Sequence, residues 1–308
     1  MGQTAYVSHR SCLLHDMGQN HPESPARIQA IEDQLIAQRL ADFLRRVDAP
    51  AATTEQLMRA HDPDYVHAIM QCAPETGTVQ LDPDTLMMPH SLDAALHSAG
   101  AVVAAIDMVL SGEIGNAFCA VRPPGHHAER KRAMGFCLFN NVAVGAAHAL
   151  AEHGLERVAI LDFDVHHGNG TEDIFAGNER VLYCSTYQHP FYPYPEPGLA
   201  APNVIHCPLA AGSNGEVFRE SVRNNWFPAL HQFHPQLLLL SAGFDGHLLD
   251  PLADMRLTDD DYQWITEALV SYANEHCDGR IVSALEGGYD LGALGRCAAV
   301  HIKALMGL

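Results

Sequence analysis

Basic residues are scarce in this sequence. It holds 18 Lys and Arg residues against 37 Asp and Glu residues, which gives a net charge of −19 at pH 7. Because so negative a chain repels the phosphate backbone of DNA and RNA, we expect no nucleic-acid partner. The charge would favour the approach of a cationic substrate, and it is equally ordinary for a soluble acidic enzyme.

Cysteine pairs are missing as well. The eight cysteines include no C-x-x-C motif, and several stand inside apolar, strand-like runs. They are Cys12, Cys72, Cys119, Cys137, Cys184, Cys207, Cys277 and Cys297. This scatter predicts reduced, buried core residues of a cytoplasmic protein rather than disulfide partners.

Long apolar stretches are also absent. The longest apolar run, residues 99–106, is much shorter than the roughly 20 residues that cross a membrane as a helix. The N-terminus has no basic segment followed by an apolar one, so no signal peptide is predicted. Tyr6 stands where a myristoylation signal requires Ser or Thr. From these absences we expect a cytoplasmic protein with no membrane partner.

What the sequence does contain is an alternation of strand-like and helix-like segments. Strands are predicted at residues 4–9, 117–121, 181–186, 204–209, 237–244 and 281–285, and a further strand begins at Val158. Helices are predicted at residues 26–39, 53–59, 62–72, 91–110, 140–153, 216–233, 258–275 and 291–306, and residues 78–89 are predicted as an extended surface loop. With no linker or repeat, residues 1–308 are predicted to form one α/β domain, a doubly wound, mainly parallel sheet with helices on both faces.

Residues 158–170 contain several residues that could bind a metal ion or take part in catalysis. They are V-A-I-L-D-F-D-V-H-H-G-N-G, which predicts a buried parallel strand that ends in a loop. Because side chains alternate along a strand, Asp162, Asp164 and His166 are expected to project to one side. Two buried carboxylates need a positive partner, and this mixture of oxygen and nitrogen donors favours zinc at an open catalytic site. The alternative is a hydrogen-bonded turn with solvated Asp and His.

A second apolar strand also ends in a carboxylate. Residues 237–245, L-L-L-L-S-A-G-F-D, place Asp245 at a strand end. The carboxyl ends of parallel strands share one edge of a sheet, which is where ligands bind in open α/β proteins. Asp245 could therefore complete a metal site with Asp164 and His166, with room left for water.

Two further strands are followed by possible proton donors and acceptors. R-P-P-G-H-H-A places His126 and His127 in an irregular loop, where imidazoles suit general acid and base catalysis or simply lie on the surface. In E-G-G-Y the paired glycines let the backbone approach a ligand and expose the hydroxyl of Tyr289 as a donor. All four strand ends thus carry groups suited to metal-assisted hydrolysis.

Taken in order, these motifs resemble the zinc-dependent histone deacetylase family, which shares its fold with the arginases. The resemblance covers nearly the whole chain, through H-P-E-S-P-A-R-I, R-P-P-G-H-H, G-F-C-L-F-N-N, D-F-D-V-H-H-G-N-G, S-A-G-F-D and E-G-G-Y-D. It implies the arginase/deacetylase fold. It also implies a hydrolase that removes acetyl or other acyl groups from lysine side chains of proteins or peptides and releases a free amine and acetate.

The resemblance further implies the roles of individual residues. One catalytic Zn²⁺ would be bound by Asp164, His166 and Asp245, and the residues with catalytic roles would be His126, His127, Tyr289 and Asp162. The acyl-lysine tunnel would be lined by Gly135, Phe136, Tyr192 and Leu252. One structural potassium ion would use Asp162, Asp164, His166, Ser185 and Thr186, and a second would use Phe175, Asn178 and Val181.

One residue departs from the pattern of the family's class I enzymes. Asn169 follows H-H-G where those enzymes have Asp, and this feature, with H-P-E-S-P-A-R-I, is similar to the class II branch. The pH behaviour of class I enzymes is therefore not expected to carry over directly.

Three other functions compete with this hypothesis. An acetylpolyamine amidohydrolase would apply the same chemistry to a small acetylated amine. A two-manganese ureohydrolase of the arginase type needs additional carboxylates, and His247 stands where such a site would want a second Asp. A non-catalytic module that binds acetylated ligands would have no use for His126, His127 and Tyr289 together.

Overall fold

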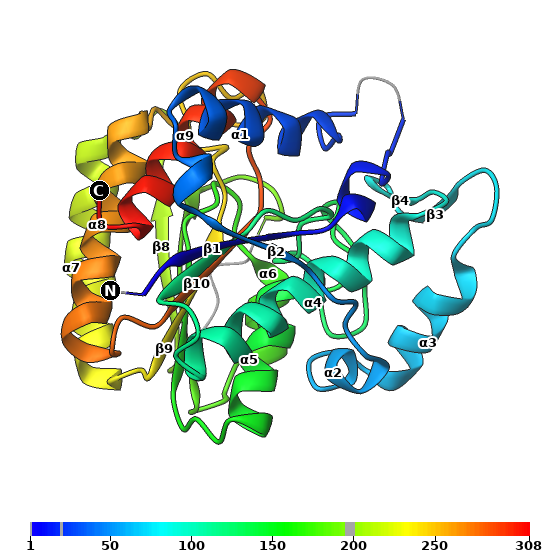
Figure 1. Cartoon of the computed structure of the whole chain (residues 1–308), viewed down its shortest axis with the longest axis horizontal. Helices are drawn as coiled ribbons and strands as arrows, with labels where there is room; N and C mark the ends of the chain where they lie inside the picture. Colours follow the sequence, from blue (N-terminus) through cyan, green and yellow to red (C-terminus); the bar gives the residue numbers. More distant parts are fainter. Residues whose placement is uncertain (1, 19–20, 195–200) are drawn as a thin grey trace.

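A parallel sheet of eight strands forms the centre of the protein (Figure 1). The structure, a computed structural model, describes residues 2–18, 21–194 and 201–308. The strands are β1 Thr4–Ser8, β2 Arg45–Asp48, β5 Asn116–Cys119, β6 Val158–Asp162, β7 Val181–Gln188, β8 Val204–Leu209, β9 Leu237–Ala242 and β10 Ile281–Leu285. Their order is β2-β1-β5-β10-β9-β6-β7-β8, and each neighbouring pair is parallel. The predicted α/β architecture is confirmed.

Helices cover both faces of this sheet (Figure 1). They are α1 Ala26–Ala37, α2 Thr54–Met58, α3 Pro63–Cys72, α4 Ser91–Leu110, α5 Asn141–Glu152, α6 Asn169–Phe175, α7 Gly215–Phe233, α8 Asp259–His276 and α9 Leu291–Leu305, with 3₁₀ turns at Arg10–Leu13 and Ala41–Phe43. Buried residues of α3, α4, α5 and α6 belong to the core on one face. Those of α1, α7, α8 and α9 belong to the core on the other, as in a doubly wound fold.

The strands are apolar on both sides because both faces of the sheet are covered. In β6, Val158 and Ile160 pack into the first core, and Ala159 and Leu161 pack into the second. All eight cysteines are free; seven are buried and Cys72 is half-buried. The expectation of unpaired cysteines inside the fold is confirmed.

Helix α4 is both long and apolar. By length and composition it could cross a membrane, although its sequence contains no unbroken apolar run of that length, and no other helix of the described residues passes the same test. Its most apolar window is 61% buried within the protein, and the helix contacts α5 and strands β1, β5 and β10. Its small apolar residues are explained by this contact, because they allow the helix to pack closely against the sheet.

Three segments differ from the prediction, and one of them is helix α6, which no predicted helix covers. Residues 78–89, predicted as a loop, contain an antiparallel hairpin of β3 Val79–Asp82 and β4 Thr85–Met87, and the buried side chain of Met87 anchors it to the core. The sequence pattern does not predict β2, because Arg45, Arg46 and Asp48 make it polar. This strand lies at the edge of the sheet, where polar side chains reach solvent.

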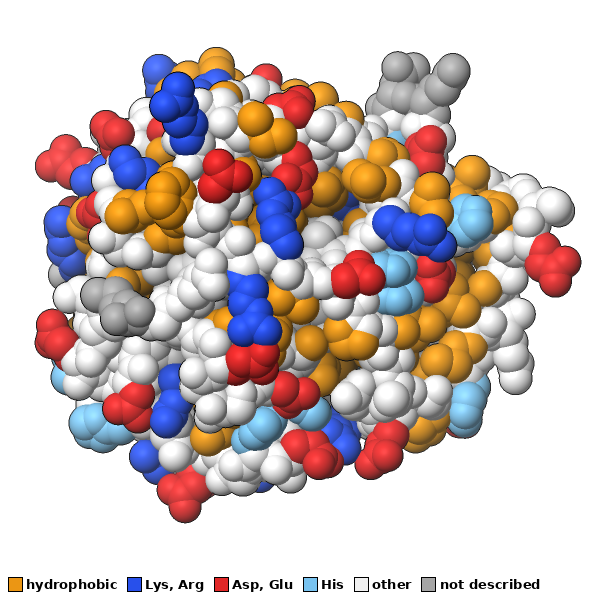
Figure 2. Space-filling model, viewed as in Figure 1, with side chains coloured by type: hydrophobic (Ala, Val, Ile, Leu, Met, Phe, Trp, Pro, Cys, Tyr) orange, Lys and Arg blue, Asp and Glu red, His pale blue; other side chains and the backbone are white. Residues whose placement is uncertain are grey.

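The topology places five strand ends side by side. Strands β5, β10, β9, β6 and β7 are consecutive neighbours, and since they are parallel their carboxyl ends share one edge. The motifs R-P-P-G-H-H, D-F-D-V-H-H-G-N-G, S-A-G-F-D and E-G-G-Y-D lie at the ends of β5, β6, β9 and β10, respectively. On the face shown in Figure 2, by contrast, Lys and Arg side chains are scattered among acidic ones and form no basic patch.

Candidate active site

Asp164, His166 and Asp245 meet at this edge of the sheet. The Nδ1 atom of His166 lies 3.0 Å from Asp164 Oδ1 and 3.1 Å from Asp245 Oδ2. The two carboxylates are buried, and 12% of the His166 side chain is exposed. Two oxygens and one nitrogen thus face a common point, which fits a zinc ion with a position left for water or substrate.

Backbone groups hold the two carboxylates in place. Val165 N–H donates to Asp245 Oδ1 at 3.0 Å, and Gly287 N–H donates to Asp164 Oδ2 at 2.8 Å. A Cβ atom on Gly287 would lie 2.0 Å from Asp245 Oδ2, and one on Gly243 would lie 2.1 Å from Asp164 Oδ2. Glycine is required at both positions because the backbone passes directly against the carboxylates.

The charges of the cluster depend on one another. Burial would lower the pKa of His166, but its hydrogen bonds to Asp164 and Asp245 raise that pKa to about 10. Burial and the charge of Asp164 raise the pKa of Asp245. A protonated imidazole thus supplies the positive charge that two adjacent carboxylates need, and a divalent cation bound to neutral His166 would supply it equally well.

Strand β6 ends at Asp162. The alternation of side chains along a strand therefore accounts for the direction of Asp162 but not for the directions of Asp164 and His166. Asp164 and His166 lie in the following loop. The Oδ2 atom of Asp162 faces His126 Nδ1 at 3.0 Å and accepts a hydrogen bond from the Tyr183 hydroxyl at 2.9 Å. Asp162 therefore contacts His126 rather than His166, an arrangement that suits its predicted role in orienting His126.

The pKa values of the two adjacent histidines are shifted in opposite directions. His127 Nδ1 lies 2.8 Å from Asn169 Oδ1, and Asn169 Nδ2 donates to Glu129 Oε1 at 2.8 Å, so the amide oxygen faces the ring. Burial and the positive charge of His126 lower the pKa of His127 well below its usual range. Burial acts in the same direction on His126, but Asp162 outweighs it and raises the pKa of His126 well above its usual range. Near neutral pH these shifts favour a neutral His127 beside a protonated His126.

A cavity of about 200 Å³ connects these groups. It is lined by the predicted residues Gly135, Phe136, Tyr192, Leu252, His127, His166 and Tyr289, together with Asp84 and Phe191. A Cβ atom on Gly135 would lie 2.4 Å from the His127 side chain, so only glycine leaves space for this imidazole. All four predicted tunnel residues thus share one cavity, whereas no sequence pattern singled out Asp84 or Phe191.

Tyr289 is placed by buried charges that the sequence patterns do not reveal. Arg27 Nε donates to the carbonyl of Gly288 at 2.7 Å, and its guanidinium carbon lies 4.9 Å from the centre of the Tyr289 ring. Fully buried Glu23 pairs with Arg27 at 3.2 Å and with Arg122 Nη2 at 2.7 Å. In the sequence, the segment H-P-E-S-P-A-R-I indicates only a resemblance to the family. In the structure, it holds the loop that carries Tyr289.

Glu286 is another residue of this site to which the sequence patterns assign no role. Its Oε2 atom accepts hydrogen bonds from the backbone N–H groups of Gly125, at 2.7 Å, and His126, at 3.1 Å. Burial raises its pKa to about 7. Its carboxyl group fixes the loop that carries the histidine pair.

The two predicted potassium sites differ in their fit. Asp162 pairs with Ser185 across β6 and β7, so the residues of the first site (Asp162, Asp164, His166, Ser185 and Thr186) lie on adjacent segments, and that site stays a prediction. The carbonyl oxygens of Phe175, Asn178 and Val181 do converge, but on the side-chain nitrogen of Asn203, at 2.8, 3.3 and 2.9 Å. The second site does not fit a bound cation as arranged, because an amide already donates to its oxygens.

His127, Tyr289 and the candidate metal ligand His166 share one cavity, an arrangement typical of a hydrolase. Comparison with known proteins then identifies the family. A histone deacetylase domain matches residues 21–305, and the chain belongs to the histone deacetylase family.

Relatives and solved structures cover almost all of the chain. A histone deacetylase-like amidohydrolase of Pseudomonas aeruginosa is 34% identical over 99% of this chain and 87% of its own length. The polyamine deacetylase HDAC10 of Homo sapiens is 33% identical over 99% of this chain, which spans 48% of that protein. The structure of the HDA15 HD domain superposes with a TM-score of 0.92 at 32% identity, over 99% of this chain and 88% of that one.

Proposed function

We propose that this chain is a zinc-dependent deacetylase that removes acetyl or other acyl groups from lysine side chains of proteins or peptides. The observation that carries the proposal is the shared cavity, in which His166, His127 and Tyr289 stand beside the apolar side chains of Phe136 and Leu252. An apolar wall suits the methylene stem of lysine, and the polar groups suit the amide at its end.

The residues divide the chemistry among them. Zinc on Asp164, His166 and Asp245 would polarise the amide carbonyl and activate a water molecule. His127, neutral because of its burial, accepts a proton, and the imidazole pair returns one to the leaving amine. Burial keeps the pKa of Tyr289 well above its usual range, so its hydroxyl stays protonated and donates to the carbonyl oxygen as negative charge develops there. The products are a free amine and acetate.

Parallel assays of acetyl-lysine peptides and acetylated polyamines test this proposal. Tyr289→Phe should lower kcat on the peptides by about 100-fold, as expected for the loss of one oxyanion donor. Tyr194→Phe, a change at a tyrosine that is 70% exposed, serves as the matched control. Chelation should abolish activity and Zn²⁺ should restore it. A metal-loaded, folded protein that hydrolyses neither substrate class would contradict the proposal.

An acetylpolyamine amidohydrolase is the second candidate, and one observation favours it. The Asp84 carboxylate lines the cavity, where it could pair with the distal ammonium of a polyamine. Its Oδ1 atom already accepts from Gly135 N–H at 3.0 Å, however, and Leu252 offers no second charge. If polyamines are the substrates, Asp84→Asn should weaken their hydrolysis far more than that of peptides.

A further inference from the structure

Four other groups of possible metal ligands occur in the described part of the chain. They are His9 with Asp93 and His97, Asp107 with His148 and His153, His167 with Glu172 and His206, and His247 with Asp259 and Cys297. A histidine binds a metal ion through a ring nitrogen that carries no proton, so its other nitrogen must donate a hydrogen bond to an acceptor. The partner of that second nitrogen therefore distinguishes a ligand from an ordinary hydrogen-bonded histidine.

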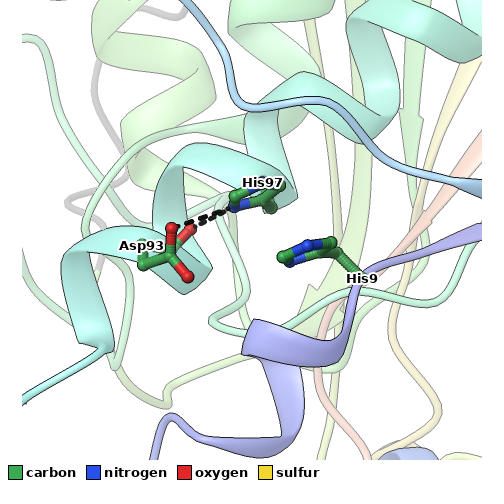
Figure 3. Close-up of side chains that lie close together, drawn as sticks. All are labelled: His9, Asp93 and His97. Carbon is green, nitrogen blue, oxygen red and sulfur yellow. Dashed lines mark hydrogen bonds and ion pairs between the residues drawn. The ribbon is translucent and has the colours of Figure 1, made fainter.

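The first group fails this test. Figure 3 shows His97 beside Asp93 on α4, with the ring of His9 lying parallel to that of His97; the ring centres are 3.6 Å apart and the planes differ by 8°. Lone pairs lie in the ring planes, so two stacked rings cannot direct them at one ion. His9 Nδ1 also accepts from Ser11 N–H at 3.2 Å, which leaves the proton on Nε2.

Two more groups fail for a similar reason. Arg59 Nη1 lies 3.1 Å from His148 Nδ1, and because a guanidinium only donates, the proton of neutral His148 is on Nε2, 2.7 Å from Asp107 Oδ1. His247 Nδ1 accepts from Leu249 N–H at 3.2 Å, so its Nε2 also carries the proton. These are hydrogen-bonded pairs.

The remaining group passes. His167 Nδ1 faces the Ser185 hydroxyl at 3.0 Å, and His206 Nδ1 faces the Tyr187 hydroxyl at 3.0 Å. A hydroxyl can accept as well as donate, so both Nδ1 atoms are free to carry the proton. Both Nε2 atoms face one carboxylate, with His167 at 2.6 Å from Glu172 Oε2 and His206 at 3.2 Å from Glu172 Oε1.

We propose that His167, Glu172 and His206 form a second metal site, for Zn²⁺ or another divalent transition ion that imidazole and carboxylate ligands accept. Two imidazoles and a carboxylate suit such ions. The His167 side chain is buried, whereas Glu172 and His206 are 26% and 23% exposed, which provides a path from solvent and positions for water.

The site is separate from the candidate active site and does not depend on the proposed reaction. His166 contacts Asp164 and Asp245, whereas His167 packs against the rings of Tyr187 and His206, with centres 4.7 and 4.8 Å away. An ion there would join the loop after β6, helix α6 and the edge strand β8. It would stabilise the loop that carries His166.

Metal counting on variants tests the site. After saturation with Zn²⁺ and removal of the unbound ion, the unchanged protein should retain two ions per chain, and His206→Asn and Glu172→Gln should retain one each. His153→Asn, a change in one of the groups that fails the test above, should still retain two. If His206→Asn binds as much zinc as the unchanged protein, the proposal is wrong.

A thermal measurement separates the two sites. In the variant Asp164→Asn/Asp245→Asn, Zn²⁺ should still raise the Tm, and adding His206→Asn should abolish that rise, because only the second site remains there. Circular dichroism would first establish that each variant is folded. The absence of any zinc-induced rise in the folded double variant would overturn the proposal and leave a hydrogen-bonded trio of side chains.

Discussion

At the scale of single residues, Asn169 is the polar neighbour of the His127 ring. Its amide oxygen lies 2.8 Å from the imidazole and carries no full charge, so burial keeps the pKa of His127 low and the ring neutral near pH 7. A carboxylate in its place would stabilise the imidazolium and raise this pKa. In Asn169→Asp the acidic limb of the kcat/KM profile should therefore move to higher pH, whereas Asn225→Asp, an exposed change of equal charge, should not move it. Identical limbs in both variants would show that His127 does not respond to this position.

We expect Leu252 to influence the choice between lysine and polyamine substrates. It lines the cavity and offers only apolar contact to a substrate. Leu252→Glu would add a partner for a distal ammonium, worth about 1 kcal/mol or less if exposed to solvent, which corresponds to a severalfold change. The ratio of N8-acetylspermidine to acetyl-lysine peptide hydrolysis should rise in Leu252→Glu and stay constant in Leu252→Gln. An unchanged ratio in both would remove Leu252 from the specificity determinants.

Sequence patterns could bring Asp164, His166, Asp245 and the histidine pair to one site, because each follows an apolar strand in a motif of its own. The residues that hold this site in place could not be predicted. Glu23 and Arg27 are charged residues buried far from Tyr289 in sequence, and only the tertiary structure shows that they pair beneath its loop. The contact of Asn203 with three carbonyl oxygens could not be predicted either, because the convergence of distant backbone groups leaves no pattern in the sequence.

At the scale of secondary structure elements, Asn203 joins the end of α6 to the start of β7. Asn203→Ala would leave buried carbonyl oxygens of Phe175 and Val181 without this donor, at a cost of about 1–3 kcal/mol in the free energy of unfolding. The vacated ring of oxygens could then accept a potassium ion. Denaturation in potassium chloride and in tetramethylammonium chloride should show a potassium-specific gain in the variant alone. An equal gain in the unchanged protein would mean that the amide does not take the place of a cation.

The elements themselves were predicted to different degrees for a physical reason. Apolar strands such as β6 and β9 are buried on both sides, and the Ala-rich helix α4 is buried over most of its length, so their sequences carry strong patterns. Strand β2 and the β3–β4 hairpin are polar or short and derive their order from neighbours, which local sequence does not show.

At the scale of the whole molecule, the net charge of −19 acts on substrates before they reach the cavity. A negative field accelerates encounter with a cationic peptide, and salt screens it over a Debye length of about 8 Å at physiological ionic strength. For an acetyl-lysine peptide flanked by Arg, kcat/KM should therefore fall as salt is added, whereas for the same peptide flanked by Glu it should rise. The value of kcat should change little for either, because bound substrate lies inside the cavity and the screened interaction governs approach. Asp84 is a carboxylate that lines the cavity. Equal salt dependence for both peptides would show that the electrostatic potential at the cavity does not have the negative sign of the net charge of the whole chain.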